Sequence, residues 1–518
     1  MTTRRSLALL TALAAAIGIA TIAAFGHGDA NAGAEARAKG ATAVPATALA
    51  YASINLDRDG SQFQALEALA AKVEGGQAAI DRLNGMLDGT DQQAQVVRAL
   101  GGDVSVGLVG ISLANGLQPS VEAVMVATAA DGAALPALLA TAGFREGPAL
   151  DGRPVWEKDA FAMTIDGSNA IAATSRATLV DALAAQAGSA PALADDAAFK
   201  ATIAKLPGDA VAIAYIAPAR LASLVQLAGS LLPQDALPQG APDTTQSLQQ
   251  LGAALEDVRG LGIAITAEQG GLRIVAAGDA DQAALKQLGA QFPTAYAPTI
   301  LSQVPADALG FAAFRDLGPM LQQAIASAQQ QSPAVKDALT SLEQSTGIKT
   351  GELLAALDGE HAVVAVGGTT PAGALLTQPQ DPAAAGATLA RALTSAQSIA
   401  EDMPLADTAK DMAEKRAKQP LPQLAVTRQG DSATLAIGTD ARLAATPSAS
   451  IADSDAYRAI VDRAGVPADV TGLAYVNGAA LRAQAVTMGA TVPAGAKAIN
   501  GVVAWGTADG ATLFISIG

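Results

Sequence analysis

The chain contains no cysteine. This absence excludes disulfide bonds, thiolate metal sites, a cysteine nucleophile and lipid attachment through a cysteine. Aromatic residues make up only 3% of the 518 residues, and histidine occurs twice. Few rings are therefore available to stack sugars or bases, and a His-based triad or a zinc site lacks its usual residues.

Positive charge is also scarce, because 32 Lys and Arg face 48 Asp and Glu and give a net charge of −16. Nucleic-acid binding requires clustered cations that displace counterions, so this charge balance argues against it. Half of the residues are hydrophobic. Ala, Val, Leu and Ile are therefore expected to form most of the core, and the length allows two to four domains.

The N-terminus has the features of an export signal. Arg4 and Arg5 precede an uncharged, apolar stretch over residues 6–26, and Ala30-Asn31-Ala32 offers a cleavage site. Residues 1–32 are predicted to be either a cleaved signal peptide or one N-terminal transmembrane anchor. Both alternatives place the rest of the chain outside the cytoplasm, soluble or anchored in the periplasm. Residues 33–43 are predicted to be a linker.

A short motif, an aliphatic residue followed by Pro, one residue and Asp or Thr, occurs four times. Its copies begin at Val44, Leu206, Val304 and Val466. The interval from the first copy to the second equals that from the third to the fourth, which indicates duplication. The residues that we expect to act structurally in this motif are Pro45, Pro207, Asp209, Pro305, Asp307, Pro467 and Asp469. Alanine in place of the three aspartates is expected to lower stability.

The correspondence extends beyond the motif. Residues 100–103, 175–179, 195–200 and 260–263 match residues 357–360, 439–443, 453–458 and 501–504. We therefore predict two α+β repeats, over residues 44–300 and 301–518. Dipeptides typical of hairpins occur at 166–167, 270–271 and 509–510. Together with the helical stretches, they predict a mainly antiparallel sheet with helices packed on it in each repeat.

Two segments carry specific expectations. Alternation over residues 50–56 predicts a half-buried strand, with Ala50, Ala52, Ile54 and Leu56 on its apolar face and Tyr51, Ser53 and Asn55 opposite. Residues 367–385 contain three prolines and repeated Ala and Gly, and are expected to be a surface loop or mobile helix.

Few residues qualify for chemistry. His361 is expected at the start of a strand, where the first repeat has Val104, so a structural role is favoured over a base or metal ligand. Asn55, Asp57 and Asp59 have the spacing of the first calcium-loop ligands, with Gly60 next. The twelfth position is Leu66 rather than Glu, so a polar turn is the alternative.

Carboxylates are the remaining candidates. Asp151, Glu157 and Asp159 lie near one predicted hairpin and could form a hydrolytic pair, although charged hairpin edges usually protect against aggregation. The sequence contains no G-x-S-x-G elbow, no P-loop and no complete dinucleotide-binding glycine motif. We therefore expect no cofactor.

The segment from Val44-Pro45-Ala46-Thr47 through Tyr51 to Asn55-Leu56-Asp57 resembles a family of exported bacterial proteins known as domain of unknown function three-three-five-two. The resemblance would cover most of residues 40–518. It departs from the family pattern at Thr47, where Asp is common, and at Arg58, where Pro is common. The family has no established activity, so the resemblance implies export and no site residues.

These observations favour an exported cell-envelope protein that is not an enzyme and that binds or scaffolds an envelope partner. A carrier of a lipid or another apolar ligand is the alternative, because sheet and helix layers rich in small aliphatic residues can enclose a cavity. A carboxylate-dependent hydrolase is the third possibility.

Overall fold

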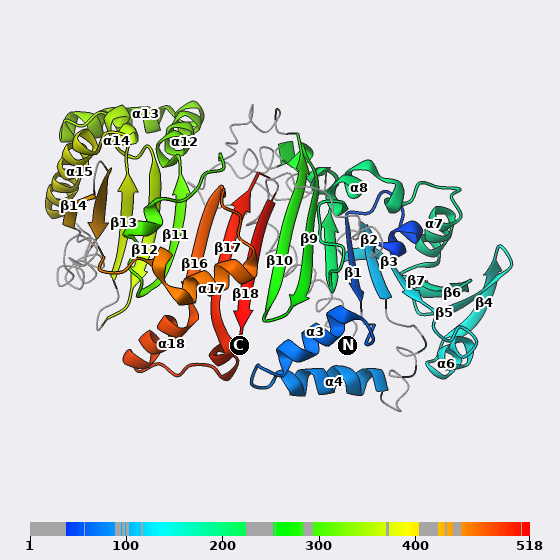
Figure 1. Ribbon diagram of the computed structural model, residues 1–518. Coiled ribbons are helices and arrows are strands. Elements are labelled where there is room, and N and C mark those ends of the chain that lie inside the picture. The colour runs from blue at the N-terminus through cyan, green and yellow to red at the C-terminus, as the bar shows by residue number, and fades with distance from the viewer. Residues whose placement is uncertain are drawn as a thin grey trace. The chain divides into compact units, whose positions relative to one another are not determined.

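The computed structural model describes residues 38–55, 57–88, 95, 99, 103–114, 118–223, 252–253, 255–281, 283, 294–368, 372–402, 423–429, 432–438, 447–508 and 510–518. The chain divides into two compact units (Figure 1). Unit 1 contains Met1–Leu288, and unit 2 contains Gly289–Ala508. Short pieces near the C-terminus are divided between them. The predicted segment 1–32 lies outside the described residues.

Unit 1 contains an antiparallel sheet with β1 near its middle. Its strands in spatial order are β4 (Arg145–Leu150), β5 (Arg153–Lys158), β6 (Phe161–Asp166), β7 (Asn169–Ala173), β3 (Gln118–Thr128), β2 (Asp103–Ala114), β1 (Ala50–Asn55), β8 (Ala212–Ile216), β9 (Val258–Glu268) and β10 (Gly271–Ala280). The hairpins predicted at 166–167 and 270–271 are confirmed as the β6–β7 and β9–β10 turns.

Unit 2 has an antiparallel sheet in which β11 takes the place of β1. Its order is β14 (Gln423–Gln429), β15 (Ser432–Gly438), β13 (Ala372–Gln378), β12 (Glu360–Val366), β11 (Ala308–Arg315), β16 (Gly472–Asn477) and β17 (Ile499–Thr507). Strand β18 covers Gly510–Ile517. The prediction of a surface loop or mobile helix over 367–385 is wrong for residues 372–378, which form β13 with Ala374, Leu376 and Thr377 buried.

Helices accompany both sheets. In unit 1 they are η1 (Lys39–Ala43), α3 (Ser61–Ala70), α4 (Gly76–Asp88), α6 (Leu135–Thr141), α7 (Arg176–Gln186), η2 (Leu193–Asp195) and α8 (Ala197–Ile203). In unit 2 they are η4 (Ile300–Gln303), α12 (Leu317–Gln331), α13 (Pro333–Thr346), α14 (Thr350–Ala356), α15 (Pro382–Asp402), η6 (Ile451–Asp453), α17 (Asp455–Ala464), α18 (Gly478–Thr487) and η7 (Ala494–Ala498). Figure 1 shows these helices beside antiparallel strands, which confirms the α+β class.

The motif copies at Val44 and Val304 each form two backbone hydrogen bonds with a distant segment of their own unit. We call this pair of bonds the backbone clamp. The Val44 carbonyl accepts from the Leu193 amide at 2.7 Å, and the Ala46 amide donates to the Pro191 carbonyl at 3.0 Å. In unit 2 the Val304 carbonyl accepts from Ile451 at 2.7 Å, and Ala306 donates to Ala449 at 3.0 Å. The residue between the two bonds needs no N–H for this bridge, so Pro45 and Pro305 fit it.

Residues 38–43 correct the predicted linker. They form η1, and Ala38, Ala41 and Ala43 are buried in the core of unit 1. Small residues are common in linkers, but here they permit close packing. Gly107 in β2 also permits close packing here, because a Cβ there would lie 2.5 Å from Cγ1 of Val44.

Strand β1 buries the face that carries its polar residues, whereas the sequence pattern predicted burial of the opposite, apolar face. Tyr51, Ser53 and Asn55 are buried, whereas Ile54 is 46% exposed. Strand β1 is therefore half-buried as predicted, but its polar alternates face the core. Hydrogen bonding makes this possible, since buried polar groups are tolerated when they are paired.

Each unit places three aromatic rings at the centre of its core. In unit 1, Phe199 of α8 makes edge-to-face contacts with Tyr51 at 5.5 Å and with Tyr215 at 4.9 Å between ring centroids. In unit 2, Tyr457 of α17 lies 5.8 Å from Phe311 and 5.1 Å from Tyr475. The rings join the helix after each clamp to two neighbouring central strands.

The motif aspartates occupy exposed positions. Asp209 accepts a hydrogen bond from Gln62 at 3.1 Å, and Gln62 in turn accepts from the Ala267 amide at 2.8 Å. Asp307 and Asp469 are also exposed. Pro207 and Pro467 precede β8 and β16. The stabilising role of the three aspartates stays a prediction.

Within the described part of the chain, no helix combines the length and apolar character needed to cross a membrane.

We predict that Gly107→Ala lowers the free energy of unfolding of unit 1 by about 1–3 kcal/mol, because the added methyl group overlaps Val44. The matched control is Gly85→Ala in α4, where nothing lies within 4 Å of the added Cβ. This control is expected to raise stability by up to about 1 kcal/mol. Urea unfolding followed by Trp156 fluorescence in a Trp505→Phe background measures both, and equal effects of the two variants would contradict the close packing of the clamp on β2.

Candidate functional site

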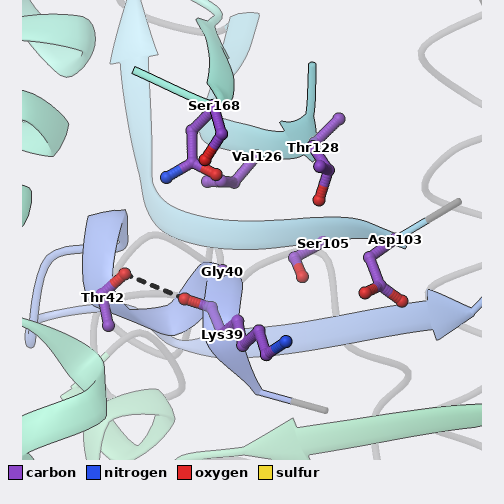
Figure 2. Close-up of a pocket in the computed structure, with 10 residues that line it drawn as sticks. Lys39, Gly40, Thr42, Asp103, Ser105, Val126, Thr128 and Ser168 are labelled. Atoms are coloured by element: carbon purple, nitrogen blue, oxygen red, sulfur yellow. Dashed lines mark hydrogen bonds between the residues drawn. The ribbon is translucent and has the colours of Figure 1, made fainter. Parts of the chain in front are cut away.

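Unit 1 contains a cavity of about 420 Å³ beside η1 (Figure 2). Its lining mixes polar and apolar surface and comprises Lys39, Gly40, Thr42, Asp103, Ser105, Val126, Ala127, Thr128, Ser168 and Asn169. This volume falls within the range of pockets that hold small molecules.

The strands bring one edge of this lining together. Asp103 begins β2, Thr128 ends β3 and Asn169 begins β7, and the β3–β7 register pairs Thr128 with Asn169. Because Val104 pairs with Ala127, Asp103 and Thr128 come at the same end of the β2–β3 ladder. Helix η1 supplies Lys39, Gly40 and Thr42, and the Thr42 hydroxyl donates to the Lys39 carbonyl at 2.8 Å (Figure 2).

A chain of hydroxyl groups runs from the cavity into the core. The Tyr51 hydroxyl donates to Ser105 Oγ at 2.9 Å, and Ser105 donates to Ser53 Oγ at 3.1 Å. Burial raises the pKa of Tyr51 and keeps it a neutral phenol. Among the described residues, no imidazole or carboxylate hydrogen-bonds Ser105. The hydroxyl therefore lacks the adjacent base that a serine nucleophile requires.

Two opposite charges line the same cavity. Lys39 and Asp103 both contribute to its wall, and Figure 2 shows the Lys39 side chain extending in the direction of Asp103. Neither side chain forms an ion pair with a residue that the structure describes. The arrangement can therefore bind a polar ligand of either or both signs.

In unit 2 a buried carboxylate lies at the start of β12. Glu360, the first residue of β12, is 8% exposed. Its carboxylate accepts from the Thr299 amide at 2.9 Å, the Ile300 amide at 2.8 Å and the Thr299 hydroxyl at 3.1 Å. Lys39 and Gly40 precede Val44 by the same number of residues as Thr299 and Ile300 precede Val304.

The proposed calcium ligands form a turn. Asn55 Oδ1 accepts from the Asp57 amide at 2.8 Å, and Asp57 Oδ1 accepts from the Asp59 amide at 3.1 Å. These are Asx-type turns, which match the alternative interpretation of the segment. Across the described ranges, no group of three or more His, Cys, Asp or Glu side chains is placed to hold a metal ion.

His361 lies inside unit 2. It is fully buried in β12, where its Nε2 lies 2.8 Å from the Leu357 carbonyl oxygen and its ring stacks on Phe314 with centroids 5.6 Å apart. Burial lowers the pKa of His361, against the opposing effect of the Asp358 and Asp316 carboxylates. The side chain packs as a strand residue and lines no described cavity.

The hydrolase candidates do not converge. Asp151 and Asp159 lie in the turns at opposite ends of β5, with φ angles of 50° and 55°. A six-residue strand separates such turns by roughly 20 Å. Glu157 pairs with Arg176 at 2.7 Å. Asp151 and Asp159 are therefore too far apart to act as a catalytic pair, and Glu157 is paired with a cation.

Sequence reasoning missed the cavity. Lys39, Gly40 and Thr42 lie in the segment predicted to be a linker, and Ser105, Thr128, Ser168 and Asn169 form no recognisable motif. One signal was present, since the match of residues 100–103 with 357–360 aligns Asp103 with Glu360.

A family model described as "Protein of unknown function (DUF3352)" matches residues 7–499 of the chain. No curated protein matches it. Among solved structures, crystal form III of TP0453 aligns with 11% identity and a TM-score of 0.26, and crystal form I with 12% and 0.24. These alignments cover 46% of this chain and 79% and 78% of the TP0453 chains. TM-scores this low carry no argument about the protein.

We predict that unit 2 loses stability as the pH falls from 7 to 5. The folded-state pKa of His361 lies below the ordinary value of 6.5, so the unfolded chain takes up a proton first. The loss therefore begins near pH 6.5 and grows by at most about 1.4 kcal/mol per pH unit. Urea unfolding followed by Trp505 fluorescence in a Trp156→Phe background measures it.

His361→Leu is expected to abolish this component, while His27→Gln leaves it unchanged. Measurement between pH 7 and 5 separates the His361 contribution to stability from carboxylate titration, which dominates at lower pH. An identical pH dependence in the wild type and in His361→Leu would contradict the assignment.

Proposed function

We propose, from the premise that this chain belongs to the DUF3352 family, that it is an exported binding protein of the cell envelope and not an enzyme. The premise gives no activity, because the family is described only as proteins of unknown function. The proposal therefore stands on the chain's own residues. Export is supported by Arg4 and Arg5, the apolar stretch at 6–26 and Ala30-Asn31-Ala32.

The cavity of unit 1 is the observation that carries the binding role. It offers a cation, a carboxylate and several hydroxyls around about 420 Å³, while Ser105 hydrogen-bonds other hydroxyls instead of a base. Such a lining suits recognition through hydrogen bonds and charge. Ser105 has no base among its described hydrogen-bond partners, so the lining does not suit a serine nucleophile.

A second surface of unit 1 supports docking of a protein partner. The strand registers align five aliphatic residues across one face of the sheet, in the order Val104, Ile54, Ala212, Ile265 and Ile274. Ile54 is 46% exposed and Ile265 is 36% exposed. Clustered exposed aliphatic side chains are typical of interaction surfaces.

We further propose that the two units are homologous repeats. The matching clamps at Val44 and Val304 and the matching aromatic trios support this interpretation, as do the helix caps. Asp196 caps α8 by accepting from the Phe199 amide, and Ser454 caps α17 by accepting from the Tyr457 amide. Agreement in backbone bonding, ring packing and capping is hard to reach by convergence within one chain.

The carrier of an apolar ligand stays an alternative. The aliphatic face of unit 1 favours it, whereas the charged and hydroxylated cavity does not, because an apolar ligand there would leave polar groups without partners.

We predict that a photo-crosslinking amino acid at Ile54 captures one specific envelope protein when the chain is expressed in its own host. The exposed aliphatic face would be in contact with that partner. The same amino acid at Val180 in α7, which is 43% exposed on another element, is the matched control. Adducts with cytoplasmic proteins, or equal adducts at both positions, would contradict an exported protein that docks through this face.

We predict that Phe199→Ala and Tyr457→Ala destabilise their own units to a similar degree, by about 3–5 kcal/mol, because each removes the central ring of a trio. Trp156 reports on unit 1 and Trp505 on unit 2. Phe161→Ala, at a ring that is 54% exposed, is the control and should have little effect. A large loss in one unit with none in the other would count against homologous repeats.

A further inference from the structure

We propose that the cavity of unit 1 binds a small zwitterion of the amino acid or short-peptide class. Lys39 would contact the ligand's carboxylate and Asp103 its ammonium group. This inference rests on the proposed binding function and adds the chemical class of the ligand.

The charges define the class. Lys39 and Asp103 line one cavity, and neither is neutralised by an ion pair with a described side chain. A ligand with only an anionic group would approach the Asp103 carboxylate, and a ligand with only a cationic group would approach the Lys39 ammonium. A zwitterion pairs both charges at once, and charge-assisted hydrogen bonds are the strong ones.

The hydroxyls and the volume fit the same class. Thr128 and Ser168 contribute hydroxyl groups to the lining, and Asn169 contributes an amide. The Thr42 and Ser105 hydroxyls already donate within unit 1. Hydroxyl and amide groups can both donate and accept, so they can satisfy the peptide groups of a ligand. A cavity of about 420 Å³ has room for more than a single amino acid, so a dipeptide is the natural probe.

Unit 2 indicates where the ligand's carboxylate would sit. There Glu360 places its own carboxylate on the Thr299 and Ile300 amides and on the Thr299 hydroxyl. Asp103 begins the equivalent strand with a side chain one methylene shorter. It forms no hydrogen bond with Lys39 or Gly40, the counterparts of Thr299 and Ile300. In unit 1 the place that Glu360 fills in unit 2 is part of the cavity.

Calorimetric titration of the full chain tests the proposal. The probe is L-alanyl-L-alanine, and the single-charge controls are N-acetyl-L-alanine and L-alaninamide. We expect the dipeptide to bind, and each control to bind at least about tenfold more weakly. Absence of dipeptide binding, or equal binding of all three compounds, would overturn the proposal.

Charge variants assign the two ends. Lys39→Gln and Asp103→Asn should each weaken dipeptide binding about tenfold or more, whereas Lys72→Gln, at an exposed lysine in unit 1, should leave it unchanged. Asp103→Asn should also remove the preference for the dipeptide over N-acetyl-L-alanine. Lys39→Gln should remove the preference over L-alaninamide. Circular dichroism melting confirms that each variant folds, and dipeptide binding insensitive to both changes would contradict the assignment.

Replacing Asp103 by glutamate, the residue type at position 360, separates failure of the zwitterion site from failure of the proposed binding function. Asp103→Glu should abolish dipeptide binding without lowering the melting temperature of unit 1, because the longer carboxylate takes the ligand's place. Retained dipeptide affinity in this variant would contradict the placement of the ligand. If the wild type binds no dipeptide while Ile54 still crosslinks to an envelope partner, the zwitterion site fails and the binding function stands.

Discussion

The backbone clamp around Pro45 and Pro305 is the constraint on which each unit depends. Two hydrogen bonds, one on each side of the proline, tie the start of the unit to the segment before α8 or α17. This tie aligns the helix so that Phe199 or Tyr457 meets two aromatic rings of the central strands. Proline suits the position because the bridge uses the carbonyl before it and the amide after it. Glycine at 107 then allows Val44 to press directly on β2.

The candidate site is a consequence of the same construction. The clamp fixes η1 beside the first residue of β2, and η4 beside the first residue of β12. With Glu360 at that place, unit 2 satisfies its own backbone amides. With Asp103, unit 1 retains a cavity that is lined by a cation, a carboxylate and hydroxyls. The side chains at these two places differ by one methylene group: Glu360 accepts from nearby backbone amides, whereas Asp103 lines a cavity.

The sequence predicted the α+β class, the antiparallel hairpins and the matched motifs, because turn dipeptides and spacing are local signals. It assigned residues 38–43 to a linker, because Ala and Gly are typical both of linkers and of closely packed segments. It also placed the apolar alternates of β1 on one face without indicating that Tyr51 and Ser53 face the core, since their hydrogen bonds to Ser105 join residues about fifty positions apart. The cavity could not be predicted for the same reason, as three strands and η1 assemble it.

Hydrogen exchange of individual backbone amides tests the central claim most directly. The four clamp amides are those of Ala46, Leu193, Ala306 and Ile451. If the clamps hold the units together, these amides exchange as slowly as those of β1 and β11, through global unfolding of their unit. Exchange at the rate of exposed loops, while β1 and β11 stay protected, would show that the cores persist without the clamps and would contradict this account.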